Sequence, residues 1–314
     1  NWPKVNYDGT KIIYGTRLEY GNMADIYLYS NGTTTLLGED VLQIFTDEKL
    51  DSALLVHNYD YDVFTGDMSR INLSTLAKEQ ITTDVWGLST ISVALTVEPE
   101  FLEKNLYFKN YDEVINVADL CMMTENGEET LLNATLVSNI QFADDYSTMY
   151  GLDYYVPEEG GEVIKIVFTD DGFERYEFDE YVKEYVISRT GKYVTYTVDD
   201  TLFYVGENNE KVYVDKIDIE TFGVLEGDER MFFFREASLG SGNAYIRGLK
   251  EKDASQMVAE GTHYCWDFGD GNLAFLTNYD FGNSTGSMYI TDGEGSYELI
   301  VDNCELPLFF NYIQ

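Results

Sequence analysis

The stretch YDGTKIIY at residues 7–14, followed by DIYL at residues 25–28, decides the fold of this chain. It reads as a strand ending in an Asp-Gly turn, a second apolar strand, a loop, and a third strand that opens with a short polar residue. Asp and Gly adopt the φ values that tight hairpin turns need. The same order of features recurs along the chain, so this stretch is one copy of a repeat.

Seven third-strand starts can be aligned, at Asp25, Asp67, Asp119, Glu162, Asp200, Asn243 and Ser287. Their successive spacings are 42, 52, 43, 38, 43 and 44 residues, with a mean of about 44. A period of this length with four strands in each repeat is typical of β-propeller blades. The sequence therefore predicts an all-β fold, a seven-bladed β-propeller of four-stranded antiparallel blades.

We expect a single β-propeller domain over residues 1–314, because no linker or low-complexity tract interrupts the repeats. The segment 306–312 (LPLFFNY) resembles another innermost strand and echoes residues 2–7. It either joins the first blade or begins an incomplete eighth repeat, which leaves an eight-bladed ring as the alternative. The approximate blades are 1–41, 42–85, 86–135, 136–182, 183–217, 218–262 and 263–314.

The charge balance restricts the possible partners. The chain carries 57 acidic and 20 basic side chains, a net charge of −37. Such a field repels phosphate backbones, so nucleic acid is excluded as an expected partner, whereas basic peptides, other proteins and neutral glycans remain. No run of 18 apolar residues exists, so no membrane insertion is expected in this segment. The chain begins at Asn1 rather than Met, which leaves a signal or anchor outside it as an expectation.

The pattern from Tyr7-Asp8-Gly9 to Asp25-Ile26-Tyr27 resembles the TolB-like propeller repeats of bacterial envelope proteins. It also resembles propeller ectodomains of Gram-positive surface proteins. The resemblance covers the whole chain as a repeat signature and contains no catalytic motif. It implies an extracytoplasmic protein, secreted or anchored at the cell surface, and a function other than catalysis.

Candidate contact residues lie in the loops after the second strands. The motif Asn-Tyr-Asp occurs at residues 58–60, 110–112 and 278–280, and Asp153-Tyr154-Tyr155 occupies the equivalent place in the fourth repeat. Tyrosine rings can stack on sugar or peptide faces, and carboxylates accept hydrogen bonds. The alternative is that Asn and Asp form local turns while the tyrosines pack between blades. The predicted binding residues are Tyr59, Asp60, Tyr111, Asp112, Tyr154, Tyr155, Tyr279 and Asp280, with Trp86 and Trp266 as stacking candidates.

Metal and catalytic chemistry have weaker sequence support. Asp60, Asp62 and Asp67 crowd one loop and are candidates for a weak structural Ca²⁺ site, without EF-hand spacing, and no other cofactor is expected. His57 and His263 have no third zinc ligand at a suitable spacing, and no nucleophile elbow is present. The three cysteines show no metal-ligand spacing and are expected to be free thiols.

The sequence thus favours a monomeric binding or scaffolding propeller that recognises a protein, peptide or glycan through its loop-rich face. A polysaccharide hydrolase or lyase with carboxylates at the channel mouth is the catalytic alternative. A purely structural spacer domain within a larger surface protein is the third hypothesis.

Overall fold

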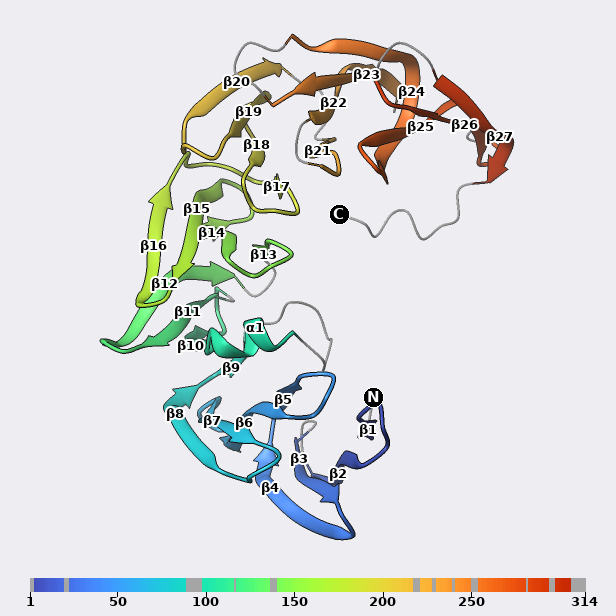
Figure 1. Cartoon of the computed structure of the whole chain (residues 1–314). Coiled ribbons are helices and arrows are strands. Elements are labelled where there is room, and N and C mark those ends of the chain that lie inside the picture. The colour runs from blue at the N-terminus through green and yellow to red at the C-terminus, as the bar shows by residue number, and fades with distance from the viewer. Residues whose placement is uncertain are drawn as a thin grey trace. The chain divides into compact units, whose positions relative to one another are not determined.

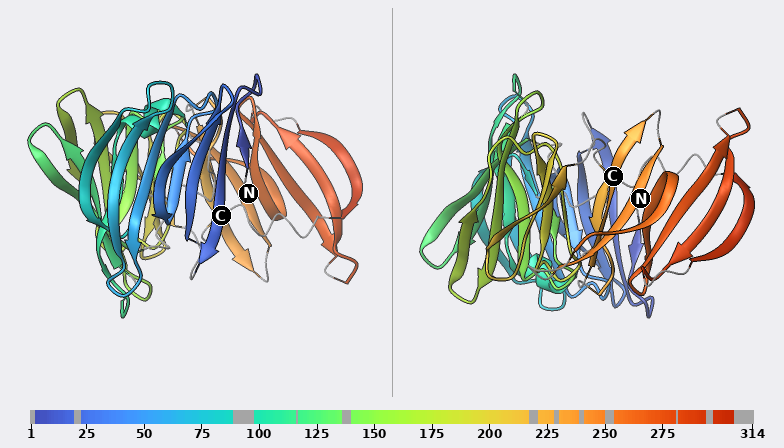
Figure 2. Two further views of the ribbon diagram at one scale, coloured as in Figure 1. Left: turned by 90° about the horizontal axis from the view of Figure 1, so that it is seen from below. Right: turned by 90° about the horizontal axis from the view of Figure 1, so that it is seen from above.

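A computed structural model describes residues 3–19, 23–88, 98–115, 117–135, 140–216, 221–227, 230–238, 241–249, 254–280, 282–293 and 297–305. The chain divides into two compact units. The first comprises residues 1–140, 151–155 and 166–175, and the second comprises residues 141–150, 156–165 and 176–314. Each unit is built from antiparallel sheets whose strands lie side by side in sequence order (Figures 1 and 2).

Three four-stranded sheets belong to the first unit. The first sheet contains β1 (Lys4–Val5), β2 (Lys11–Glu19), β3 (Met23–Ser30) and β4 (Thr33–Val41). The second contains β5 (Gln43–Thr46), β6 (Ser52–Asp60), β7 (Thr65–Asn72) and β8 (Lys78–Val85). The third contains β9 (Gly87–Leu88), β10 (Leu106–Asp112), β11 (Val117–Thr124) and β12 (Gly127–Thr135).

The next two sheets repeat the same order. The fourth sheet contains β13 (Gln141–Phe142), β14 (Thr148–Val156), β15 (Gly160–Thr169) and β16 (Gly172–Glu177), and its strands are divided between the units. The fifth contains β17 (Tyr185–Ile187), β18 (Val194–Val198), β19 (Thr201–Val205) and β20 (Lys211–Lys216). Both begin with a short strand at one edge of the sheet, and the three longer strands follow in sequence order.

The last sheet has seven strands in the order β21 to β27. They are β21 (Phe222–Val224), β22 (Arg230–Ser238), β23 (Ser241–Gly248), β24 (Gln256–Gly269), β25 (Asn272–Asp280), β26 (Thr285–Thr291) and β27 (Tyr297–Glu305). The predicted blade boundary at 262/263 falls inside β24, a strand of 14 residues. Its first half pairs with β23 and its second half with β25, so one strand serves two consecutive repeats.

The predicted all-β class is therefore confirmed, with four-stranded antiparallel sheets as its unit. Six of the seven predicted third-strand starts lie within strands, namely β3, β7, β11, β15, β23 and β26, and Asp200 lies in the turn directly before β19. The number of blades in a closed ring and the single-domain organisation stay predictions. The segment 306–312, on which ring closure depends, lies outside the described residues.

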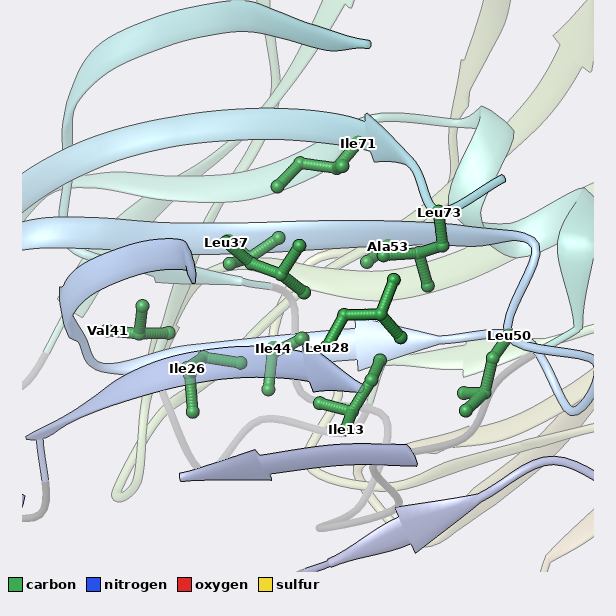
Figure 3. Close-up of a cluster of buried hydrophobic side chains, with 11 residues drawn as sticks. Ile13, Ile26, Leu28, Leu37, Val41, Ile44, Leu50, Ala53, Ile71 and Leu73 are labelled. Carbon is green, nitrogen blue, oxygen red and sulfur yellow. The ribbon is translucent and has the colours of Figure 1, made fainter. Parts of the chain in front are cut away.

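Continuous apolar runs in the second strands reflect burial on both faces. Between the first two sheets, side chains of β2, β3 and β4 meet those of β5, β6 and β7 in one hydrophobic cluster (Figure 3). Leu55 of β6 is fully buried in it, as is Ala53. In the second unit, Phe233 and Tyr204 anchor an equivalent cluster between the fifth sheet and the start of the last. Packing of sheet on sheet thus explains why strict polar alternation is missing.

The insertion of the third repeat forms the short helix α1 (Pro99–Glu103). Proline at its first turn suits the fixed φ of that position. Phe101 and Leu102 are buried, and the Phe101 ring lies 6.2 Å from that of Phe45. Arg70 Nη2 donates to the Leu102 carbonyl at 2.7 Å, so the insertion is part of the folded body of the first unit.

Glutamine side chains connect the short first strands of neighbouring sheets, β5 with β9 and β13 with β17. The Leu88 N–H donates to Gln43 Oε1 at 2.7 Å. In the second unit Gln141 Nε2 donates to the Tyr185 carbonyl at 2.9 Å, and the Ile187 N–H donates to Gln141 Oε1 at 3.1 Å. A side-chain amide offers both a donor and an acceptor, so it can satisfy backbone groups that no sheet ladder reaches.

Candidate functional site

The recurring Asn-Tyr-Asp motif forms a β-bulge at the end of each second strand that carries it. Asn58, Asn110 and Asn278 have φ values of 51°, 53° and 51°. The pairing register shifts directly after His57, Lys109 and Thr277. Asparagine tolerates this left-handed conformation better than most residues, which explains its recurrence at the bulge.

The polar side chains of the motif bind the local backbone and the opposite strand. Asn58 Nδ2 donates to Asp67 Oδ2 at 2.8 Å, and Asn110 Nδ2 donates to Asp119 Oδ2 at 2.7 Å. Asp60 accepts from the Asp62 N–H at 2.8 Å. These contacts support the architectural interpretation for the Asn and Asp positions.

The other two motif aspartates hold their loops in the same way. Asp112 accepts from the Val114 N–H, and Asp280 accepts from the Gly282 N–H, each at 2.8 Å. The backbone hydrogen bond from Gly282 lowers the pKa of Asp280. Each of these turns is an Asx turn, in which a carboxylate orders the loop that follows.

A glycine opposite the bulge lets the two strands approach. A Cβ on Gly66 would lie 2.9 Å from the His57 carbonyl oxygen and 3.0 Å from Tyr59 Cδ2. At the equivalent Gly286, a Cβ would lie 2.9 Å from Leu276 Cγ. The Thr-Gly pair that both repeats share is thus a packing requirement of the bulge.

A continuous series of aromatic rings joins the loops of the second and third sheets. The Tyr59 ring contacts Tyr61 at 5.2 Å, and Tyr61 contacts Phe64 at 6.5 Å between centroids. Phe64 lies 6.5 Å from Tyr111, which lies 4.6 Å from Trp86 at an interplanar angle of 33°. Edge-to-face and offset arrangements at these distances are favourable.

Buried rings hold both ends of this series. Tyr59 is buried, and burial, with a further contribution from Tyr61, raises its pKa to about 12. At the other end Trp86 packs on the buried Phe108 at 6.2 Å. The four rings between the ends, Tyr61, Phe64, Trp86 and Tyr111, are partly exposed, and we call them the aromatic loop cluster.

Exposed aliphatic side chains extend the aromatic loop cluster toward solvent. Val63 is 62% exposed, Val114 is 87% exposed and Ile115 is 63% exposed. They lie on the same two loops as Phe64 and Tyr111, next to the exposed carboxylates of Asp62 and Glu113. Neighbouring apolar side chains on loop tips are the kind of surface that marks an interaction site. We call these residues together the loop surface: Val63, Val114 and Ile115 with the aromatic loop cluster.

The sequence identified half of the aromatic loop cluster. Trp86 and Tyr111 were predicted binding residues, whereas Tyr61 and Phe64 were not. The available signal was a difference between repeats. Asn283-Ser284 stands in the last repeat where Val63-Phe64 stands in the second, so the last repeat lacks the apolar tip of the second.

The fourth repeat carries its motif one position out of step. Tyr154, with φ of 49°, takes the left-handed place that Asn58 has in the second repeat. Its side chain is 72% exposed, whereas Tyr155 is half-buried. Asp153 lies before the bulge and is 3% exposed, paired with Arg175 through an Nη2 to Oδ2 distance of 2.6 Å. Asp153 therefore aligns with His57 rather than with Asp60, and its buried carboxylate pairs with an arginine whose side chain is 27% exposed.

Replacing Tyr154 with asparagine is expected to raise the free energy of unfolding by about 1 kcal/mol, because a bulky residue at positive φ costs about 1–2 kcal/mol and asparagine costs less. Urea unfolding followed by tryptophan fluorescence measures the change. Tyr29→Asn is the control, since Tyr29 is also exposed but lies within β3 and is not among the residues with positive φ. A Tyr154→Asn variant no more stable than the wild type would show that the left-handed conformation carries no strain.

The predicted residues of the last repeat lie in the second unit. The Tyr279 ring contacts His263 and Tyr264, each at 5.7 Å. Trp266 lies on β24 and pairs with Ala274 of β25. These rings belong to the second unit, whereas the aromatic loop cluster belongs to the first.

His57 is buried, and its Nε2 lies 2.9 Å from Ser69 Oγ. Burial, and then the positive charge of Lys78, lower the pKa of His57. Among the residues that the structure describes, no group of three His, Cys, Asp or Glu side chains is placed to hold a metal ion. The Ca²⁺ site at Asp60, Asp62 and Asp67 therefore gains no geometric support.

All three cysteines are free thiols, as predicted. Burial raises the pKa of Cys121 to about 11 and also raises that of Cys265. Both thiols are therefore protonated at neutral pH and poorly nucleophilic. Within the described ranges, no helix is long and apolar enough to cross a membrane.

No protein-family model matches the chain, and no curated protein is significantly similar to it in sequence. Among solved structures, it is similar to a eukaryotic initiation factor with a TM-score of 0.50 and 11% identity, over 96% of this chain and 78% of that chain. It is also similar to the β-propeller domain of the trilobed protease from Pyrococcus furiosus, with a TM-score of 0.35 and 12% identity, over 98% and 97% of the two chains. A third similarity is to TolB from Acinetobacter baumannii, with a TM-score of 0.30 and 11% identity, over 81% and 53%. At such identities the likeness concerns the fold alone.

Proposed function

We propose that this chain is a binding module that recognises a protein segment through the loop surface of its first unit. The observation that carries the proposal is the apolar tip itself. Val63, Val114 and Ile115 are each more than half exposed, and they adjoin Phe64 and Tyr111, whose rings pack on each other. Buried aromatic anchors with exposed apolar neighbours are typical of the centre of a protein interface.

The chemistry of the loop surface favours a peptide over a sugar. Glycan sites need polar groups free to bind hydroxyls, but Asp60 and Asp112 already accept backbone hydrogen bonds from their own loops. Branched aliphatic side chains such as Val114 and Ile115 offer no flat face for a sugar ring. They suit apolar side chains of a partner.

The charge of the chain indicates what should surround those apolar anchors in the partner. Asp62 and Glu113 border the loop surface, and the whole chain has a net charge of −37. A partner with Lys or Arg beside its apolar residues would associate faster, and salt would weaken this effect. A non-catalytic role outside the cytoplasm, suggested by the resemblance to envelope propeller repeats, forms part of the proposal.

The test replaces the two apolar residues at the loop tip of the second repeat with the polar residues of the last repeat, and then measures peptide binding. In the variant V63N/F64S, the loop receives the residues that the last repeat has at positions 283 and 284. Peptides selected from a displayed random library on the wild-type chain should combine apolar anchors with basic flanks. Their affinity for the variant should fall by at least about 30-fold, as expected when a hot spot worth about 2 kcal/mol is lost.

The matched control removes similar apolar surface elsewhere. Val156→Asn with Tyr181→Ser changes two exposed side chains, 45% and 62% accessible, in the second unit. The selected peptides should bind this control as they bind the wild type. Equal losses in both variants, or binders found only on a glycan array, would contradict the proposal.

A further inference from the structure

The second unit contains a cavity that is separate from the loop surface. Its volume is about 420 Å³, within the range of small-molecule sites. Residues 257–260 of β24 line one side of it, and Phe275, Tyr289 and Tyr297 contribute from β25, β26 and β27. The lining residues all belong to the second unit.

The shared strand β24 explains why space exists there. Residues 256–259 pair with β23, whereas residues 262–269 pair with β25. Gly261 lies between these halves with φ of 60°, a left-handed conformation that turns the strand. The first half of β24 therefore pairs with β23 and not with β25, and residues of β25, β26 and β27 line the cavity beside it.

Three aromatic rings form one corner of the cavity. Phe275 and Tyr289 lie parallel on neighbouring strands, with centroids 5.7 Å apart and an interplanar angle of 16°. Tyr297 stands nearly perpendicular to both, at 79° and 88°, with centroids 5.9 Å and 5.4 Å away. The three rings therefore pack on one another and form an aromatic wall at this side of the cavity, in which Phe275 is 1% exposed and Tyr297 is 61% exposed.

The charged side chain that lines the cavity is negative. Glu260 supplies a carboxylate to the lining, and the lining contains no Lys or Arg. Thr277 and Asn278 add polar groups that can accept or donate hydrogen bonds. Ring faces carry negative quadrupole potential, so the aromatic corner and Glu260 favour the same ligand charge.

We propose that this cavity binds a quaternary ammonium group, with Tyr289 and Tyr297 against its methyl groups and Glu260 as its counter-charge. An unmethylated ammonium is strongly hydrated, and it can pair with any of the 57 acidic side chains of this chain. It therefore has no particular preference for this cavity. A quaternary ammonium has no N–H donor and cannot form hydrogen bonds to a carboxylate. Carboxylates alone therefore do not select it over other cations. Aromatic rings provide this selectivity, because a ring face attracts the positive charge and also makes apolar contact with the methyl groups.

The experiment compares a cation with its neutral isostere. Isothermal titration with choline, and separately with tetramethylammonium, measures binding to the wild-type chain, and 3,3-dimethyl-1-butanol replaces the nitrogen of choline by carbon. Both cations should bind, and the isostere should bind at least about tenfold more weakly. Equal binding of choline and the isostere would show an apolar cavity without charge preference and overturn the proposal. Absence of any binding by both cations would also overturn it.

Two substitutions separate the aromatic corner from the general field of the chain. Tyr297→Ala removes a ring that is 61% exposed, so folding should survive, as circular dichroism can verify. It should weaken choline binding about 3- to 30-fold, the usual range of one cation–π contact. Glu260→Gln should weaken binding by several-fold, whereas Glu180→Gln, an exposed carboxylate outside the lining, should leave it unchanged. If both Gln variants weakened choline binding equally, the attraction would come from the net charge of the chain and not from Glu260. That result would contradict a specific site in this cavity.

Discussion

Replacing Arg175 with methionine is expected to lower the free energy of unfolding by about 3–5 kcal/mol, because it leaves a buried carboxylate without its cation. Arg175 Nη2 lies 2.6 Å from Asp153 Oδ2, and the Asp153 side chain is 4% exposed. Asp153 also accepts the Asn133 N–H at 2.6 Å, and Arg175 Nη1 donates to the Leu131 carbonyl. Removal of the guanidinium therefore breaks a network within the first unit that joins β16 to β14 and to β12. Urea unfolding at pH 7 measures the loss.

The chain supplies a matched exposed pair. Arg189 Nη1 lies 2.8 Å from Glu226 Oε1, but the two side chains are 63% and 35% exposed. Arg189→Met should cost less than about 1 kcal/mol, since water screens and replaces such pairs. In the double variant D153L/R175M, much of the lost stability should return because no buried charge is left alone. A loss below about 1 kcal/mol for R175M would show that Asp153 is not dependent on its partner.

Replacing Leu55 with alanine is expected to lower the free energy of unfolding by about 2–5 kcal/mol. Leu55 is fully buried at the centre of the cluster between the first two sheets, and it pairs with Ile44 across β5 and β6. Removing its side chain loses transfer free energy and leaves a cavity that two opposed sheets cannot close. Thermal and urea unfolding followed by circular dichroism would report the change.

Leu36→Ala makes the same chemical change where no cavity can form. Leu36 lies on β4 and is 43% exposed, so its loss should cost less than about 1 kcal/mol. Similar losses for the Leu36 and Leu55 variants would contradict the view that packing between sheets, rather than strand propensity, stabilises the first unit.

Most strand positions could be predicted because their signals are local. An Asp-Gly turn and a polar third-strand start act within one repeat, and six of the seven starts predicted from the sequence lie in strands, with Asp200 directly before β19. The boundary at residue 262 could not be found in this way. Whether β24 ends there depends on which neighbours pair with its two halves, and those neighbours are β23 and β25.

The candidate site was predictable only in part, for a related reason. Recurrence drew attention to Asn58-Tyr59-Asp60 and its copies, yet the Asn and Asp side chains bind their own bulge and loop. Phe64 contacts Tyr111 only because two loops from different repeats meet. Such a contact depends on how one sheet packs on the next, and no pattern within a repeat encodes it.

The sequence by itself therefore determined the all-β class, the four-stranded repeat and the strongly acidic character of the chain. These follow from periodicity, turn chemistry and net charge, which can all be read from the sequence without knowledge of the fold. The tertiary structure alone decided the aromatic loop cluster, the burial of Asp153 against Arg175 and the cavity beside β24. Each of these joins residues that are distant in the chain, so each exists only once sheet-on-sheet packing and strand pairing have set the distances between them.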